Sequence, residues 1–151
     1  MLADFRDYLK GTGLANVELR STQGILQSTE GILTGNTLKA DHYSIGKINN
    51  AQQKSIGIYS QNGFGRVEAF GLESSYDVAG VRILVHWNKN ADETEIVSRI
   101  LYDKLRYITN QPMGSSYVYM VEMTEGEPVF IGTDDNNVYE YHIGLLLYYK
   151  R

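Results

Sequence analysis

Three histidines, His42, His86 and His142, are the residues of this chain best suited to catalysis or metal binding. Histidine metal sites use short spacings such as HxH, HxxxH or HExxH, and none of the three stands at such a spacing. His86 and His142 fall on the more polar faces of predicted strands, so we expect both to be solvated. The chain has no Cys, which excludes thiolate metal sites and cysteine nucleophiles. The sequence predicts no catalytic residue, no metal site and no cofactor.

Loops that bind phosphate or cations are also poorly matched. Gly46-Lys47 is followed by Ile48 rather than Ser or Thr, unlike a phosphate-binding loop. Gly63-Phe64-Gly65 precedes a predicted strand, whereas a dinucleotide-binding loop precedes a helix. The run from Thr133 to Asn137 consists of oxygen-bearing side chains that could ligate a hard cation, but it lacks the Gly and the distal Glu of a calcium loop. We therefore expect a plain β-turn there rather than a metal site.

Composition is that of one globular domain. The chain has 151 residues, of which 42% are hydrophobic and 21% charged, and its net charge is −4. This charge lacks the basic excess of a typical nucleic-acid-binding domain. No apolar run is long enough to span a membrane, and acids stand near the start where a signal peptide carries bases. We expect a chain that is neither secreted nor inserted in a membrane.

The first part of the chain predicts a short helix and a loop-rich region. Leu2, Phe5 and Leu9 have helical spacing, so residues 1–11 are assigned to an N-terminal helix. Residues 21–50 are interpreted as a loop-rich arm or insertion, in which a Ser-Thr-x-Gly-Ile-Leu segment occurs twice. Residues 55–60 and 66–70 predict two strands joined by a turn through Asn62-Gly63.

The remaining residues show regular periodicity. Residues 81–87 alternate as a half-buried strand, and residues 92–108 have the acidic start and apolar stripe of a helix. Strands are then predicted at 117–123, 128–131 and 138–149, with the second pairing back on the first. The predicted fold class is α+β: a mixed or antiparallel sheet with a C-terminal meander packed against one main helix. Residues 55–151 would form the core of a single domain.

The order of these elements, with one turn motif, resembles a known family. In the run 127–135, a proline, apolar residues and a glycine precede an acidic turn and a long final strand. The matching positions are Pro128, Gly132, Asp134 and Asp135. This pattern is similar to the tail-terminator proteins of long-tailed phages, called minor capsid or tail-completion proteins in phages of Gram-positive hosts. The resemblance covers about residues 55–151.

The resemblance implies a structural virion protein rather than an enzyme. Such a chain forms a ring, expected to be a homohexamer, at the head-proximal end of the tail tube, where it stops tube polymerisation and joins the tail to the head. Its implied partners are copies of itself, the tail tube protein and the head–tail connector or stopper protein. DNA would pass through the acidic ring without specific binding, and no membrane is involved. The protein would be assembled in the host cytoplasm and reside in the virion tail or neck.

Two groups of residues are candidate contacts with other subunits. The final strand carries apolar residues on both faces, which is more than one helix can cover. The doubled Ile-Leu pairs lie in polar, glycine-containing sequence, which is typical of an arm that becomes ordered on a partner. The candidates are Ile25, Leu26, Ile32, Leu33, Tyr139, Tyr141, Leu146 and Tyr148. For Leu146 and Tyr148 the alternative is a second layer within the same chain, formed by the 56–70 hairpin or the first helix.

Two other functions remain open at this point. A head–tail connector or stopper protein would differ from a terminator in its partner. A small α+β ligand-binding or enzymatic domain would place His86, His142 and Glu140 in a pocket. Between Tyr107 and Tyr149 the chain has six acids and no Lys or Arg. This acidic stretch predicts either a solvated edge or a surface that meets a basic partner.

Overall fold

A computed structural model describes residues 1–12, 17–18, 37–38, 40–49, 51–61 and 76–150. The predicted strand at 66–70 and the doubled Ile-Leu pairs lie outside these ranges. The helices are α1 (Leu2–Thr12) and α3 (Ala91–Leu105). The strands are β1 (Val17–Glu18), β2 (Thr37–Leu38), β3 (His42–Ile45), β4 (Ser55–Ser60), β5 (Asp77–His86), β6 (Thr109–Met113), β7 (Ser116–Met123), β8 (Val129–Thr133) and β9 (Tyr139–Lys150). None of the described helices is long and apolar enough to cross a membrane.

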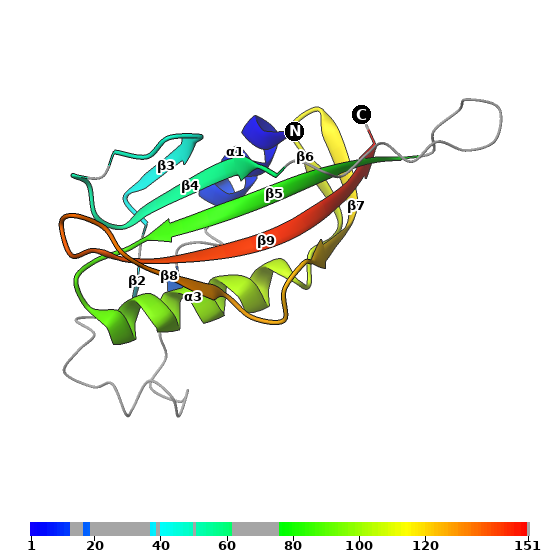
Figure 1. Ribbon diagram of the computed structural model, residues 1–151. Coiled ribbons are helices and arrows are strands. Elements are labelled where there is room, and N and C mark those ends of the chain that lie inside the picture. Colours follow the sequence, from blue (N-terminus) through cyan, green and yellow to red (C-terminus); the bar gives the residue numbers. More distant parts are fainter. Residues whose placement is uncertain (13–16, 19–36, 39, 50, 62–75, 151) are drawn as a thin grey trace.

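The main sheet has seven strands and is mixed. Its order is β3-β4-β5-β9-β7-β6, with β8 paired to β9 beside this path. β3 and β4 run parallel, and every other pairing in the sheet is antiparallel. β1 and β2 form a separate antiparallel pair. The predicted α+β class is confirmed. The C-terminal strands belong to the mixed sheet and pack against one main helix (Figure 1).

β5 and β9 lie at the centre of the sheet, which has one face covered by helices and an opposite face. On β5 and β9, the alternate residues are fully or almost fully buried, as the period-2 pattern predicts. They are Val81, Ile83, Val85, Ile143, Leu145 and Leu147. These side chains form one core with Leu101 and Leu105 of α3 and with Phe5 and Leu9 of α1. Figure 1 shows α3 running along the sheet beside β9 and β8. We call this covered side the inner face and the other side the outer face.

The main helix begins at a well-formed cap and ends earlier than its sequence suggests. The Asn90 side chain accepts a hydrogen bond from the backbone N–H of Glu93, and Asp92 and Glu93 lie in the first turn. The helix was predicted to extend to residue 108 and to end at Asn110 and Pro112, but it ends at Leu105. Asn110, with φ 50°, and Pro112 lie within β6. Pro112 is tolerated there because β6 is an edge strand.

Replacing Asn90 by alanine should lower the free energy of unfolding by about 1 kcal/mol. The variant loses the side-chain oxygen that accepts from the Glu93 N–H, so this donor at the helix start must find water. Urea denaturation followed by circular dichroism measures the change. Lys89→Ala, one residue earlier and outside the cap, is the control. Equal stability of the two variants would contradict the capping role.

The C-terminal strands pair differently from the predicted meander. β8 does not pair back on β7: it pairs with residues 139–142 of β9, and β7 pairs with residues 145–150 of the same strand. Both neighbours therefore lie along one edge of β9. This is possible because β9 has 12 residues, which is long enough to hold a short strand and a longer one in succession. β8 is consequently a short edge strand beside the start of β9.

Candidate assembly surface

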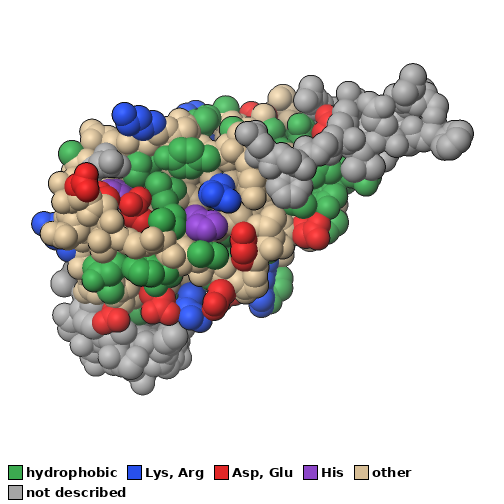
Figure 2. All heavy atoms as spheres, viewed as in Figure 1, with side chains coloured by type: hydrophobic (Ala, Val, Ile, Leu, Met, Phe, Trp, Pro, Cys, Tyr) green, Lys and Arg blue, Asp and Glu red, His purple; other side chains and the backbone are tan. Residues whose placement is uncertain are grey.

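The outer face carries apolar side chains that no described helix covers. Leu84 on β5 and Leu146 and Tyr148 on β9 are half-buried there, beside exposed Arg82. The first helix, one of the two elements considered as a second layer, does not lie over them, because its Phe5 belongs to the inner core. The other element, the 56–70 hairpin, includes residues outside the described ranges. Figure 2 shows both signs of charge interspersed among hydrophobic side chains on the face in view.

β8 is the most exposed apolar element of the described chain. Phe130 and Ile131 on this strand are each 53% exposed. Among the described strands, β8 pairs only with β9, so its second edge carries backbone N–H and C=O groups with no strand beside them. Gly132, with φ 132°, accompanies the bulge between Phe130 and Gly132. An apolar strand with a free edge is a ready template for contact with another chain.

Two hollows flank β8, one on each side of the sheet edge. The hollow on the outer face has a volume of about 410 Å³, and Leu84, Tyr59 and Ile131 supply apolar lining. The hollow on the α3 side has about 300 Å³ and is bordered by Glu95 and Arg99. Phe130 borders both hollows. We call the three apolar residues of β8, Val129, Phe130 and Ile131, together with the outer hollow, the β8 surface.

A second patch lies at the far end of β9, where tyrosines and an acid meet. The Tyr148 hydroxyl donates a hydrogen bond of 2.6 Å to the Glu122 carboxylate. This bond to a carboxylate, together with burial and the negative charge of Glu122, raises the pKa of Tyr148 above its ordinary value. The ring of Tyr148 also packs against that of Tyr76, with centroids 5.7 Å apart. Such half-wet aromatic residues suit a partly polar contact surface.

The structure separates the candidate contacts of β9 into two groups. Leu146 and Tyr148 lie on the outer face, as their alternation predicts. Tyr139 and Tyr141 lie on the inner face, where both rings contact Phe130 of β8. The other four candidates, Ile25, Leu26, Ile32 and Leu33, lie outside the described residues.

The motif-matching residues frame β8. Pro128 immediately precedes the strand, and Gly132 lies within it. Asp134 organises the following turn, because its Oδ1 accepts from the backbone N–H groups of Asn136 and Val138 at 2.9 Å each. Asp135 is exposed. The predicted turn at 133–137 is therefore present, held by an aspartate that bonds to its own backbone.

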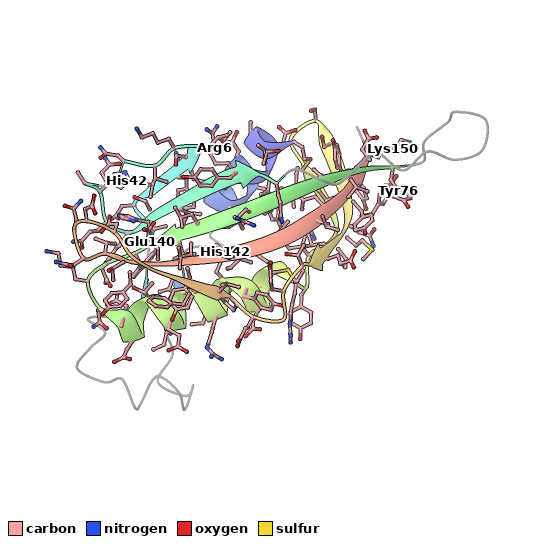
Figure 3. All side chains as sticks on the ribbon, viewed as in Figure 1. Arg6, His42, Tyr76, Glu140, His142 and Lys150 are labelled. Carbon is pink, nitrogen blue, oxygen red and sulfur yellow. The ribbon has the colours of Figure 1, made fainter. Side chains whose placement is uncertain are left out.

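The two strand histidines have different environments, and one of them contradicts the prediction. His142 is half-buried and lines the outer hollow. His86 was expected to be solvated, yet it is 0% exposed. The reason is that the turn after β8 brings Asp134 over the end of β5. With no exposed surface, His86 cannot itself touch a substrate in the pocket considered for an enzymatic alternative. Figure 3 shows Glu140 and His142 on β9.

The imidazole of His142 predicts a pH dependence of stability. Burial lowers its pKa below the ordinary value of 6.5; the positive charge of Arg82 lowers it further, and Glu125 opposes the shift. The unfolded chain therefore binds more protons as the pH falls. The contribution of the neutral imidazole is complete above the unfolded pKa and is lost as the pH falls through the folded pKa. His142→Gln should accordingly lose less stability than the wild type between about pH 7 and about pH 5.

Urea midpoints at the two pH values measure this difference. His42→Gln, which changes an exposed histidine, serves as the control. Its urea midpoint should change between the two pH values as much as that of the wild type. An NMR titration of the His142 ring in Arg82→Gln should show a higher pKa than in the wild type, because a positive neighbour has been removed. If the urea midpoint of His142→Gln changed between the two pH values as much as that of the wild type, His142 would not be the source of the pH dependence.

Sequence reasoning missed Phe130 and Ile131 as candidate contacts. The available signal was the unbroken apolar run 129–131, which does not alternate as a half-exposed strand should. This run was interpreted as a motif and a strand rather than as exposed surface. The chain matches no protein-family model, and no curated protein matches it in sequence.

Proposed function

We propose that this chain is a structural virion protein, a tail terminator that forms a ring at the head-proximal end of the tail tube of a long-tailed phage. In this role it occupies the growing face of the last tube ring, so that no further tube subunit adds. Its opposite side offers a docking face to the head–tail connector. The mechanism is geometric and requires no covalent step.

The observation that carries the proposal is the β8 surface. The residues that resemble the tail-terminator family, Pro128 to Asp135, frame the strand on which Phe130 and Ile131 are most exposed. A ring needs two different surfaces on each subunit that meet head to tail and close by rotation. An apolar edge strand flanked by two hollows supplies one such surface. The β9 patch around Leu146 and Tyr148 is a candidate for a second.

The charge distribution also supports the proposal. DNA must slide through a terminator ring without being held. The chain is acidic overall, and the face in Figure 2 shows no continuous stripe of Lys and Arg. Exposed Glu122 on β7, Glu127 in the loop before β8 and Asp135 in the turn after β8 add negative charge to this part of the surface. A ring of such subunits repels phosphate rather than binding it.

The experiment is to measure the mass of the tag-free chain by light scattering and to image it by negative stain, with and without tail tubes of the same phage. We expect rings that bind one end of each tube and stop its growth when added during polymerisation. Tubes without the chain should continue to lengthen. A monomer that leaves tube length unchanged would overturn the proposal. Rings that bind the connector but not the tube would replace it with the stopper alternative.

A further inference from the structure

Three side chains that are distant in sequence meet beneath the turn after β8. His86 ends β5, Asp134 follows β8, and Glu140 is the second residue of β9. The Nε2 atom of His86 is 3.6 Å from Oδ2 of Asp134, and its Nδ1 atom is 3.3 Å from Oε2 of Glu140. The exposed fractions of the three side chains are 0%, 9% and 17%. One ligand atom from each residue lies within 4.8 Å of the other two.

The Asp134 carboxylate is held in place by its own turn. Oδ1 accepts the two backbone N–H groups of Asn136 and Val138. Oδ2 is buried, has no hydrogen-bond partner among the described residues, and faces His86. Both ring nitrogens of His86 are likewise buried without a hydrogen bond to any described residue. The site is therefore preorganised around polar atoms that need a partner.

Charge points to a cation. Within the described ranges, neither Asp134 nor Glu140 forms an ion pair with Lys or Arg; His86 is their common partner. The combined negative charge of the two carboxylates is larger than the positive charge of even a protonated histidine. Buried charges in proteins are paired or bind metal ions, because an unpaired one is costly. A divalent cation beside a neutral imidazole would balance both carboxylates.

We propose that Nε2 of His86 and Oδ2 of Asp134 bind a divalent first-row metal ion, with Zn²⁺ as its probe. Ligands about 2.0–2.2 Å from a tetrahedral zinc ion lie about 3.3–3.6 Å from each other. The 3.6 Å separation of these two atoms fits this spacing and exceeds the length of an N–H···O hydrogen bond. A histidine gives one nitrogen to a metal and donates from the other. Glu140 lies on the Nδ1 side and would accept that hydrogen bond, completing a carboxylate–histidine–metal arrangement.

The metal would join the end of β5 to the turn that follows β8. The proposal does not depend on a phage function, since it rests on the donor atoms alone. Sequence spacing could not reveal it, because the two ligands come from a strand and from a turn that are distant in sequence. The oxygen-rich run 133–137 contributes one ligand, and the second arrives through the pairing of β5 with β9. Two further ligands, water molecules or backbone carbonyls, would complete a tetrahedral coordination.

The test is calorimetric titration of the tag-free, chelator-treated chain with Zn²⁺. We expect one equivalent to bind and the melting temperature to rise with Zn²⁺ concentration. Asp134→Asn is the decisive variant, because the amide oxygen can still accept the two backbone N–H groups while Oδ2 is lost. Asp135→Asn, which removes the same charge from the adjacent exposed residue, is the matched control. Asp134→Asn should weaken Zn²⁺ binding at least about tenfold, and Asp135→Asn should not.

Two further measurements keep the proposal falsifiable. Glu140→Gln should weaken binding by about 10–100-fold, the usual effect of losing the carboxylate behind a ligating histidine. If Asp134→Asn fails to fold, Co²⁺ added to the ¹⁵N-labelled wild type should broaden amide signals around His86 and Asp134 first. Failure of the wild type to bind Zn²⁺ overturns the proposal. Equal binding by Asp134→Asn and Asp135→Asn, or loss of binding in His42→Gln, overturns it as well.

Discussion

Ile131→Glu is expected to leave the subunit folded and to abolish both ring formation and tube capping. Ile131 is 53% exposed, so a glutamate there remains solvated in the free subunit. In a ring whose contacts include the β8 surface, the same carboxylate would be buried against another subunit, and Arg82 in the outer hollow would offset only part of the cost. Burying an unpaired charge costs several kcal/mol, and each 1.4 kcal/mol weakens an association about tenfold. We therefore expect subunit association to weaken by at least about two orders of magnitude.

Light scattering and negative-stain imaging with tail tubes measure the loss. The matched control is Ile45→Glu, which introduces the same charge at an isoleucine that is 39% exposed on the opposite edge strand, β3. Circular dichroism and thermal melting should give the same fold for both variants. Rings formed by Ile131→Glu as readily as by the wild type would remove the β8 surface from the proposed interface. Loss of rings in Ile45→Glu alone would move the interface to β3.

Trp87→Phe is expected to lower the free energy of unfolding by about 2–4 kcal/mol. Trp87 is fully buried, and its Nε1–H donates a hydrogen bond of 3.2 Å to the carboxylate of Glu93, which is itself 8% exposed. Phenylalanine fills less of the space and has no N–H. The buried carboxylate at the start of α3 would then lose a donor as well as packing. Chemical denaturation measures the change, provided that the variant and the wild type have the same m value, the slope of unfolding free energy against denaturant concentration.

A double-mutant cycle separates the hydrogen bond from the packing. Glu93→Leu removes the carboxylate, so Trp87→Phe should cost less in that background than in the wild type. We expect the difference to be about 1–2 kcal/mol, since the wild-type background leaves a buried charged group unsatisfied. Equal costs in the two backgrounds would show that packing accounts for the whole effect of Trp87.

Sequence periodicity predicted much of the fold. The elements that it missed are strands that form through pairing with other strands, which periodicity does not specify. The alternation on β9 correctly separates Leu145 and Leu147 from Leu146 and Tyr148. β5, however, begins at Asp77 rather than at Val81, because its first residues pair with the end of β9 through register positions such as Asp77 with Tyr149. No local pattern in Asp77 to Gly80 predicts a strand. β3 was also missed, since His42–Ile45 gains its order from parallel pairing with β4.

The candidate surface was only partly predictable for a similar reason. The sequence pointed to the final strand and to the turn around Asp134, and both are near the β8 surface. Exposure of Ile131 depends on which strand occupies the sheet edge, and that is decided by β9 pairing with β7 and β8 in succession. Burial of His86 depends on the same arrangement, because the turn that covers it follows β8. Both properties are set by long-range pairing.

β9 has a place in the sheet that bears on how the chain is made. It follows all the other described strands along the chain and yet lies between β5 and β7, with β8 also paired to it. β9 is the only described strand that joins β3-β4-β5 to β6-β7, so without it these two groups would share no strand pairing. The β8 surface can therefore form only after β9 has been synthesised, and pairing between strands so distant in sequence is slow. If the chain is a tail terminator, as proposed above, this order would keep an incomplete subunit from capping a growing tube.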